Sequence, residues 1–185
     1  AQTTFAERER LFNLPRAYWT DYNRELISEG GGVFNRSDKT IEINEQIRQA
    51  LGIEDEVSEL TPAELIRAII AAPVDLLYTG GTGTYVRSSS ETDADVRDST
   101  NDSMRITAPE LRVKVVGEGG NLGLTHRARI EAARHGVLLN TDAVDNSAGV
   151  ETSDHEVNLK ILVDRLVDAG EISNCLLYTS DAADE

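Results

Sequence analysis

The sequence predicts an α/β fold, in which a parallel sheet is partly doubly wound and helices flank its strands. Short apolar runs of strand length recur along the chain, and glycine-rich turns follow them. Segments with helical periodicity separate these runs. Strands that alternate with helices in this way form parallel sheets, because each connecting helix packs back onto the sheet.

Length and composition predict one acidic globular domain. The chain has 185 residues, of which 39% are apolar and 28% charged, and its net charge is −15. This charge argues against nucleic acid or an anionic membrane as a partner, because both would repel it. No run approaches the roughly 18 apolar residues of a membrane span, and the N-terminal residues resemble no signal peptide. We therefore expect a cytoplasmic protein.

The first elements are short helices. Two amphipathic helices are expected at residues 5–12 and 17–27, because Pro15 interrupts the pattern between them. Asn44 then caps a further helix, which Gly52 ends.

The next helix has the strongest start signal in the chain. Thr61 and Glu64 form a capping box, and the helix ends before Pro73. Residues 74–78 are an apolar run of strand length, and residues 80–83 form a glycine-rich turn directly after it.

A second strand and helix follow a polar segment. Residues 88–102 are rich in serine and acidic residues, so we expect a solvated loop there. Residues 111–116 form the second apolar strand, and it leads into a glycine-rich turn at residues 117–123. Thr125 caps the next helix, which stops at Gly136.

The last elements are a strand, a turn and a long helix. Residues 137–139 form the third strand, and residues 142–150 form the turn. The helix is expected from Ser153 to about Ala169. Its buried side is expected to carry Val157, Ile161, Leu162 and Leu166.

Ligand-binding loops are expected where the strands end, at Gly80, Gly117 and Asp142. Gly117, Gly119 and Gly123 follow a strand and open a helix, as in a dinucleotide fingerprint. Three residues precede the last glycine, however, where two are commoner. The pattern alone leaves open whether this turn binds a pyrophosphate or only lets the helix pack closely on the strand.

No metal centre or nucleophilic triad is expected. Asp154, His155 and Glu156 are adjacent, so they point in different directions around a helix. Ser153 and Glu156 form a capping box, which accounts for Ser153 without a catalytic role. Cys175 is the single cysteine, which excludes a disulfide framework and a multi-thiolate metal site.

Four strings resemble the large bacterial NAD-specific glutamate dehydrogenases. They are ISEGGGVF at residues 27–34, APVDLL at 72–77, VVGEGGNLG at 115–123 and NTDAVDNSAGV at 140–150. DHEVN at residues 154–158 continues the match. The resemblance spans about residues 5–173, and its motifs occur in the family's order.

The resemblance implies a fold, a reaction and a domain assignment. The family's Rossmann-like cofactor domain binds NAD, and its enzymes oxidise L-glutamate to 2-oxoglutarate and ammonium. Residues 1–174 would be the later part of that catalytic region, in a full-length enzyme expected to be a homo-oligomer. Residues 175–185 continue no pattern and resemble a translated sequencing-library adaptor, so we expect them not to be biological.

The resemblance also assigns site residues. Within the motif that begins at Glu118, Asn121 would lie beside the nicotinamide ribose, and Ser153 would bind the side-chain carboxylate of the substrate. The implied cofactor-binding residues are Gly80, Gly81, Gly119, Gly120, Asn121 and Asn146. The implied substrate-binding residues are Gly149, Val150 and Ser153.

The chain departs from the family pattern at two loop positions, where Thr82 replaces an isoleucine and Arg97 a glycine. The family's phosphate loop, its catalytic lysine and its catalytic aspartate are expected before Ala1, so Gly117 would not begin the pyrophosphate loop. We therefore expect no catalytic residue in this chain and no turnover by the chain alone. Two alternatives remain, a non-catalytic nucleotide-binding module and another amino-acid dehydrogenase of similar fold.

Overall fold

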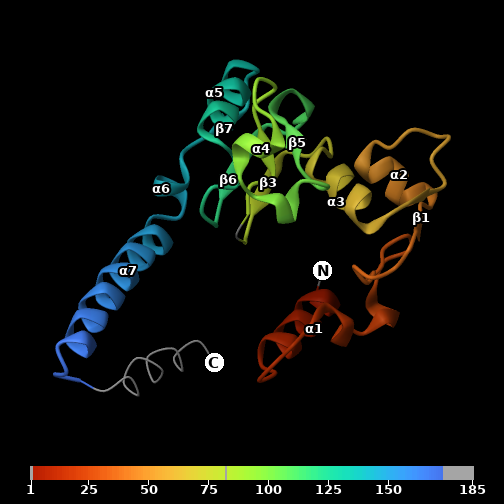
Figure 1. Cartoon of the computed structure of the whole chain (residues 1–185). Coiled ribbons are helices and arrows are strands. Elements are labelled where there is room, and N and C mark those ends of the chain that lie inside the picture. Colours follow the sequence, from red (N-terminus) through yellow and green to blue (C-terminus); the bar gives the residue numbers. More distant parts are fainter. Residues whose placement is uncertain (1, 82, 173–185) are drawn as a thin grey trace.

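A parallel three-stranded sheet lies at the centre of the structure, a computed structural model that describes residues 2–81 and 83–172 (Figure 1). Its strands are β3 (Leu76–Thr79), β6 (Val115–Glu118) and β7 (Leu138–Leu139), in the order β3-β6-β7. Both neighbouring pairs are parallel, so all three strands end at the same edge. The predicted α/β fold with a partial parallel sheet is confirmed.

The strand expected at residues 111–116 is shorter in the structure than the apolar run that predicts it. β6 starts at Val115, while Leu111 and Val113 are buried in the core ahead of the strand. The amide of Val115 donates to the carbonyl of Asp75 at 2.9 Å, immediately before β3. The apolar run therefore marks the residues that are buried, and only its last part is paired in the sheet.

Two capped helices cover one face of the sheet. α3 (Pro62–Ile70) begins after Thr61, whose amide donates to the Glu64 carboxylate at 2.8 Å, as the capping box predicts. α5 (His126–Arg134) begins after Thr125, whose hydroxyl oxygen accepts an amide of the first turn at 3.0 Å. The main core includes Ile70, Val86, Ile106, Leu111, Val113, Val116, Leu124, Ala128, Ala132 and Val137.

The opposite face of the sheet exposes apolar side chains. On β3, Leu76 is 54% exposed and Tyr78 is 65% exposed, and Leu138 on β7 is 68% exposed. Successive side chains of a strand point to opposite faces of the sheet, and these three lie on the face opposite the core. The described residues thus supply the helices of one face of a doubly wound sheet.

The N-terminal segment contains one regular helix rather than two. α1 (Gln2–Phe12) confirms the first prediction, but residues 17–27 form two 3-10 turns, η1 (Trp19–Asp21) and η2 (Arg24–Leu26). The side chain of Asn23 accepts a backbone amide of the second turn at 3.0 Å. Local bonds of this kind compete with a continuous helix, so the prediction of a helix at residues 17–27 is wrong.

A small second core forms among β1 (Ile41–Glu42), α2 (Glu45–Leu51), β2 (Glu59–Leu60) and the start of α3. α2 is capped by Asn44 and ends at Gly52, whose φ is +61°, as predicted. β1 pairs with β2 in an antiparallel ribbon. The buried residues of this core are Ile41, Ile43 and Leu65.

Residues 88–102 are only partly the solvated loop that their composition predicts, because most of them are exposed or half-buried but the segment contains helical turns and two buried residues. They lie between the strands of a short parallel pair, and Ser88 and Asn101 are buried. The elements of this part of the chain are β4 (Val86–Arg87), α4 (Asp93–Val96), η3 (Ser99–Asn101), β5 (Ile106–Thr107) and η4 (Ala108–Glu110).

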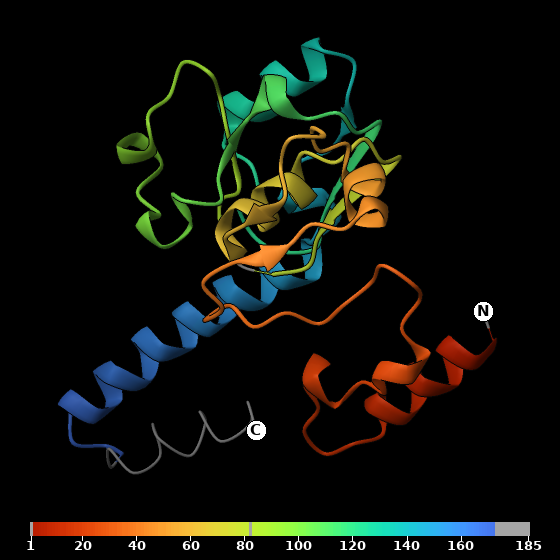
Figure 2. The ribbon, with the colours of Figure 1, turned by 90° about the vertical axis from the view of Figure 1, so that its right-hand side faces the viewer.

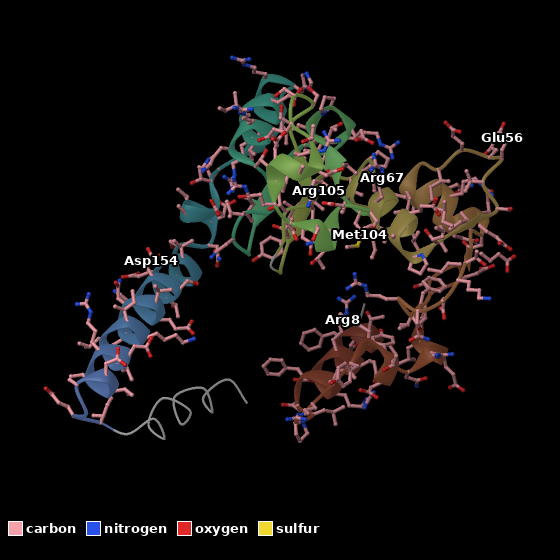
Figure 3. The ribbon with its side chains drawn as sticks, in the orientation of Figure 1. Arg8, Glu56, Arg67, Met104, Arg105 and Asp154 are labelled. Carbon is pink, nitrogen blue, oxygen red and sulfur yellow. The ribbon has the colours of Figure 1, made fainter. Side chains whose placement is uncertain are left out.

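Arg105 explains why this segment folds (Figure 3). Its side chain is fully buried and forms ion pairs with Asp93 at 2.9 Å and with Asp102 at 2.6 Å. Its Nε donates to the carbonyl of Thr84 at 2.8 Å. An arginine just outside the segment therefore neutralises acidic residues that the composition had assigned to solvent.

The last helix begins earlier than predicted. α6 (Asp142–Asp145) is followed at once by α7 (Ser147–Asp168), so Ser153 lies inside the helix. The interpretation of Ser153 as a helix cap is wrong, because α7 has already begun at Ser147. Gly149 lowers the helix propensity of the first turn but does not prevent it from forming.

The apolar stripe of α7 is exposed rather than buried. Val157, Ile161 and Leu162 all face solvent, and α7 projects away from the sheet (Figures 1 and 2). The stripe keeps the predicted helical spacing, but the prediction that it is buried is wrong for these three residues, and the fourth, Leu166, is only half-buried. The proposed adaptor, residues 175–185, and Thr82 lie outside the described residues.

The Arg105 cluster predicts a loss of stability in acid. Hydrogen bonds from the Asn101 side chain and the Thr84 amide lower the pKa of Asp98 from its ordinary 3.8. A lowered pKa contributes stability that is present above pH 3.8 and is lost as the pH falls through the folded-state value. We expect the melting temperature of the chain to exceed that of Asp98→Asn at neutral pH, and the difference to shrink below pH 3.8.

The matched control is Asp75→Asn. Asp75 pairs with Lys114 at 2.7 Å, but the two side chains are 84% and 79% exposed, so solvent screens the pair. Melting curves measured from neutral to acid pH should show little change for this variant. A pH-independent difference between the chain and Asp98→Asn would contradict the prediction.

Candidate functional site

Three chain segments meet at the carboxyl edge of the parallel sheet. The first leaves β3 at residues 79–81, the second leaves β6 at residues 119–123, and the third runs from α6 into α7. The predicted loops that follow the strands therefore lie at one edge, although Gly117, the predicted start of the second loop, is still part of β6. In open parallel sheets this is the edge where ligands bind.

The glycine turns after β3 and β6 touch each other. The amide of Gly119 donates to the carbonyl of Thr79 at 2.7 Å. A Cβ atom on Gly120 would overlap the carbonyl group of Gly81, so only glycine allows the two backbones to lie this close. Four of the predicted cofactor-binding glycines thus lie in two adjoining turns.

The two predicted asparagines are hydrogen-bonded to each other. Nδ2 of Asn146 donates to Oδ1 of Asn121 at 2.8 Å, although 25 residues separate them in sequence. A Cβ atom on Gly149 would lie 2.5 Å from the Asn146 amide group, so glycine there leaves room for this side chain. The pair leaves the Nδ2 donors of Asn121 and the Oδ1 acceptor of Asn146 for other partners.

The backbone next to Asn121 is strained. Leu122 has a φ of +56°, a left-handed conformation that costs a residue with a bulky side chain about 1–2 kcal/mol. Its amide donates to Oδ2 of Asp142 at 2.8 Å. This bond ties the strained turn to the first residue of α6.

Arg129 of α5 forms ion pairs with two carboxylates behind the turn. Its Nη2 lies 2.6 Å from Oε2 of Glu118 and 3.0 Å from Oδ1 of Asp142. The side chain of Glu118 is 1% exposed and that of Arg129 is 6% exposed. Oε1 of Glu118 accepts the amide of Leu124 at 2.8 Å.

The two carboxyl groups differ in protonation tendency. Burial raises the pKa of Glu118, and the hydrogen bond from Arg129 opposes this shift. Burial acts on Asp142 in the same direction, but the Leu122 amide and the charge of Arg129 outweigh it and lower its pKa. Of the two carboxyl groups that share Arg129, Asp142 therefore has the stronger tendency to stay ionised.

A hollow adjoins this edge on the uncovered face of the sheet. Its volume is about 390 Å³, and Val115, Gly117, Leu138, Asn140 and Asp145 line it with two neighbours. It lies beside the same segment that carries Asn146, so the edge is open to a ligand from this side. Among residues 2–81 and 83–172, no group of three His, Cys, Asp or Glu side chains is placed to hold a metal ion.

Comparison with known proteins decides the family. The family described as bacterial NAD-glutamate dehydrogenase, catalytic domain, matches residues 1–177. The chain belongs to this family. The resemblance seen in the sequence to bacterial NAD-specific glutamate dehydrogenases is thereby confirmed.

Similar proteins carry the corresponding name. The chain is 57% identical over 173 residues to the NAD-specific glutamate dehydrogenase of Halomonas elongata. It is 55% identical over 176 residues to that of Mycobacterium tuberculosis and 54% identical over 173 residues to that of Pseudomonas aeruginosa. These matches cover 93% to 94% of the chain and 11% of each relative, so the chain spans about a ninth of their length.

The structure places most, but not all, of the predicted site residues of this bacterial NAD-glutamate dehydrogenase segment together. The glycine turns and the two asparagines share the edge of the sheet, and Gly149 and Val150 lie in the first turn of α7 beside Asn146. Ser153, by contrast, is exposed on α7, seven residues after Asn146. In the described part of the chain, every helix is too short or too polar to cross a membrane.

The sequence analysis did not single out Arg129. The available signal was its position on α5, where it shares the buried side of the helix with Ala128 and Ala132. An arginine on a face otherwise made of small apolar residues indicates a buried charge that needs an acidic partner.

Gly120 provides a test of the contact between the two turns. Gly120→Ala would press a methyl group onto the Gly81 carbonyl, and backbone atoms on both sides would have to move. Overpacking of this kind costs about 1–3 kcal/mol, which urea unfolding of the chain would measure. Gly81→Ala is the matched control, since its Cβ would meet nothing within 4 Å, and equal losses for both variants would contradict the contact.

Proposed function

We propose that this chain is the part of an NAD-dependent glutamate dehydrogenase that holds the nicotinamide end of the cofactor. The full-length enzyme would oxidise L-glutamate to 2-oxoglutarate and ammonium. The observation that carries the proposal is the hydrogen bond between Asn121 and Asn146 at the carboxyl edge of the sheet. The names of the relatives support NAD as the cofactor and glutamate as the substrate.

The residues at this edge fit a dinucleotide. Gly81 is exposed and lies in close contact with Gly120. Because neither residue has a side chain, a ligand can approach the backbone of the turn at Gly81. The amides of Asn121 and Asn146 offer both donors and acceptors, the types of group that a ribose and a carboxamide require. We assign Gly80, Gly81, Gly119 and Gly120 to the same binding surface.

The contribution of the chain to the reaction is orientation. NAD, when bound, accepts a hydride from the α-carbon of the substrate. Asn121 and Asn146 restrain each other, so their side chains need little reordering to hold a ligand in one orientation. Orientation of reacting groups accounts for a large share of enzymatic rate enhancement.

The proposed site residues here are amides, glycines, a valine and a serine, none of which is a general base near neutral pH. We propose that the base and a carbonyl-polarising lysine come from elsewhere in the full-length protein. Gly149 and Val150 would border the substrate, and Ser153 would donate a hydrogen bond to its side-chain carboxylate. Because α7 starts at Ser147, the helix dipole contributes little at Ser153.

Replacement of the asparagines tests the cofactor role. In the full-length enzyme, Asn121→Ala and Asn146→Ala should each lower kcat/KM about tenfold or more, which corresponds to roughly 1.4 kcal/mol from one oriented hydrogen bond. The melting temperature should change little, because both side chains are on the rim of the sheet. Because the amides bond to each other, the double variant should lose less than the product of the single losses.

Asn158→Ala is the matched control. Asn158 is exposed on α7, where its Nδ2 donates to the carbonyl of Asp154 at 2.9 Å. Steady-state kinetics of this variant should equal those of the parent. Full activity of Asn146→Ala together with a lowered melting temperature would make Asn146 a turn residue and contradict the proposal.

Ser153→Asp tests the substrate role. An aspartate there would set a negative charge against the glutamate carboxylate, so KM for glutamate should rise about tenfold or more. NAD binding and the melting temperature should not change, since Ser153 is exposed and does not cap the helix. Thr152→Asp adds the same charge on a different side of α7 and should leave KM unaltered. Equal glutamate kinetics for Ser153→Asp and the parent would remove Ser153 from the site.

A further inference from the structure

The guanidinium of Arg129 is the centre of a buried network that reaches both segments of the proposed cofactor site. Nε and Nη2 donate to Oε2 of Glu118 at 3.1 and 2.6 Å. Nη2 also lies 3.0 Å from Oδ1 of Asp142, whose side chain is 13% exposed. Nη1 lies 3.3 Å from Nδ1 of His126 on the same helix.

Each carboxylate uses its second oxygen to hold the backbone after Asn121. Oε1 of Glu118 accepts the amide of Leu124, and Oδ2 of Asp142 accepts the amide of Leu122, both at 2.8 Å. Leu122 keeps its left-handed conformation only while its surroundings hold it there. The orientation of the Asn121 side chain therefore depends on the carboxylates of Glu118 and Asp142, which the ion pairs with Arg129 hold in place.

The same network also fixes the segment that carries Asn146. Asp142 begins α6 and Asn146 ends it, so one turn of helix connects the arginine contact to the amide. At the far end of that turn, Oδ2 of Asp145 accepts the amide of Glu118 at 3.1 Å. α6 is thus attached to the end of β6 at both of its ends.

We propose that Arg129 is a positioning residue, whose guanidinium joins Glu118 to Asp142 and thereby holds Asn121 against Asn146. Arg129 itself contacts neither amide and acts through the two carboxylates. The inference rests on the proposed function, in which these two amides hold the nicotinamide end of NAD. A lysine is a poor replacement, because Nε and Nη2 together hold Glu118 while Nη2 also pairs with Asp142, and a single ammonium group lacks this planar fork.

The first experiment is steady-state kinetics of the full-length enzyme with Arg129→Lys. Misplacement of the amides should raise KM for NAD between about tenfold and a hundredfold. In a double-mutant cycle, the effects of Arg129→Lys and Asn121→Ala should be far from additive, because one acts through the other. Additive effects, or an unaltered KM for NAD, would overturn the proposal.

Arg112→Lys is the matched control. Arg112 also binds through several nitrogens, with Nε donating to the Ala71 carbonyl at 2.6 Å and Nη2 to that of Leu51 at 2.8 Å. It precedes β6 and so lies at the amino end of the sheet, away from the amide pair. This variant should melt at a lower temperature with KM for NAD unchanged, and a rise equal to that of Arg129→Lys would overturn the positioning role.

Hydrogen exchange separates failure of this inference from failure of the proposed function. Asp142→Asn keeps an oxygen for the Leu122 amide but removes the charge that faces Arg129. It disturbs the core less than Arg129→Lys does. In both Arg129→Lys and Asp142→Asn, amides 119–124 should exchange at least about tenfold faster than in the parent. If exchange is faster in Arg129→Lys and Asp142→Asn but Asn121→Ala leaves the NAD kinetics unaffected, only the cofactor role is refuted. If exchange is unchanged in Arg129→Lys and Asp142→Asn, the role of Arg129 is refuted.

Discussion

The buried contact of Arg129 with Glu118 and Asp142 is the interaction on which the carboxyl edge of the sheet depends. A parallel sheet brings the ends of its strands to one edge, but it does not fix the loops that follow. Here one guanidinium joins the last residue of β6 to the first residue of α6. Each carboxylate then uses its remaining oxygen on a loop amide, so the charge pair and the backbone form one connected unit. Loss of the arginine would leave two carboxylates unpaired in a poorly solvated place.

Much of the fold follows from local signals in the sequence. Thr61, Thr125 and Asn44 cap the helices that their patterns predict, and three apolar runs supply the strands of the sheet. The predictions that are wrong depend on distant partners or on competing local bonds. Residues 88–102 have the composition of a loop, because Arg105, which pairs with Asp93 and Asp102, lies just outside the segment. Residues 17–27 have the periodicity of a helix, because side-chain bonds such as that of Asn23 leave no periodic signature.

The candidate site divides in the same way. The resemblance to bacterial glutamate dehydrogenases named Asn121 and Asn146, and the structure adds that they bond directly. No pattern in the sequence could show that bond, because the two residues are 25 positions apart and a strand and two helices intervene. Arg129 was missed for a related reason, since an arginine on a helix is usually a solvent-facing residue. Ser153 shows the reverse case, in which a correct capping pattern loses to a helix that starts one and a half turns earlier.

Two buried arginines also pair with several of the acidic residues in this part of the chain. Arg105 pairs with Asp93 and Asp102, whose side chains are 41% and 42% exposed, and Arg129 pairs with Glu118 and Asp142, whose side chains are 1% and 13% exposed. Arg105 also binds the carbonyl of Thr84, close to the glycine turn after β3, and Arg129 holds the turn after β6. Each of the two turns that touch through Gly81 and Gly120 thus has a buried arginine bonded to residues within or next to it. The half-buried amides of Asn121 and Asn146 carry the binding chemistry, and the Arg129 network sets their positions. A substitution in that network should therefore disturb geometry, and one in an amide should disturb binding.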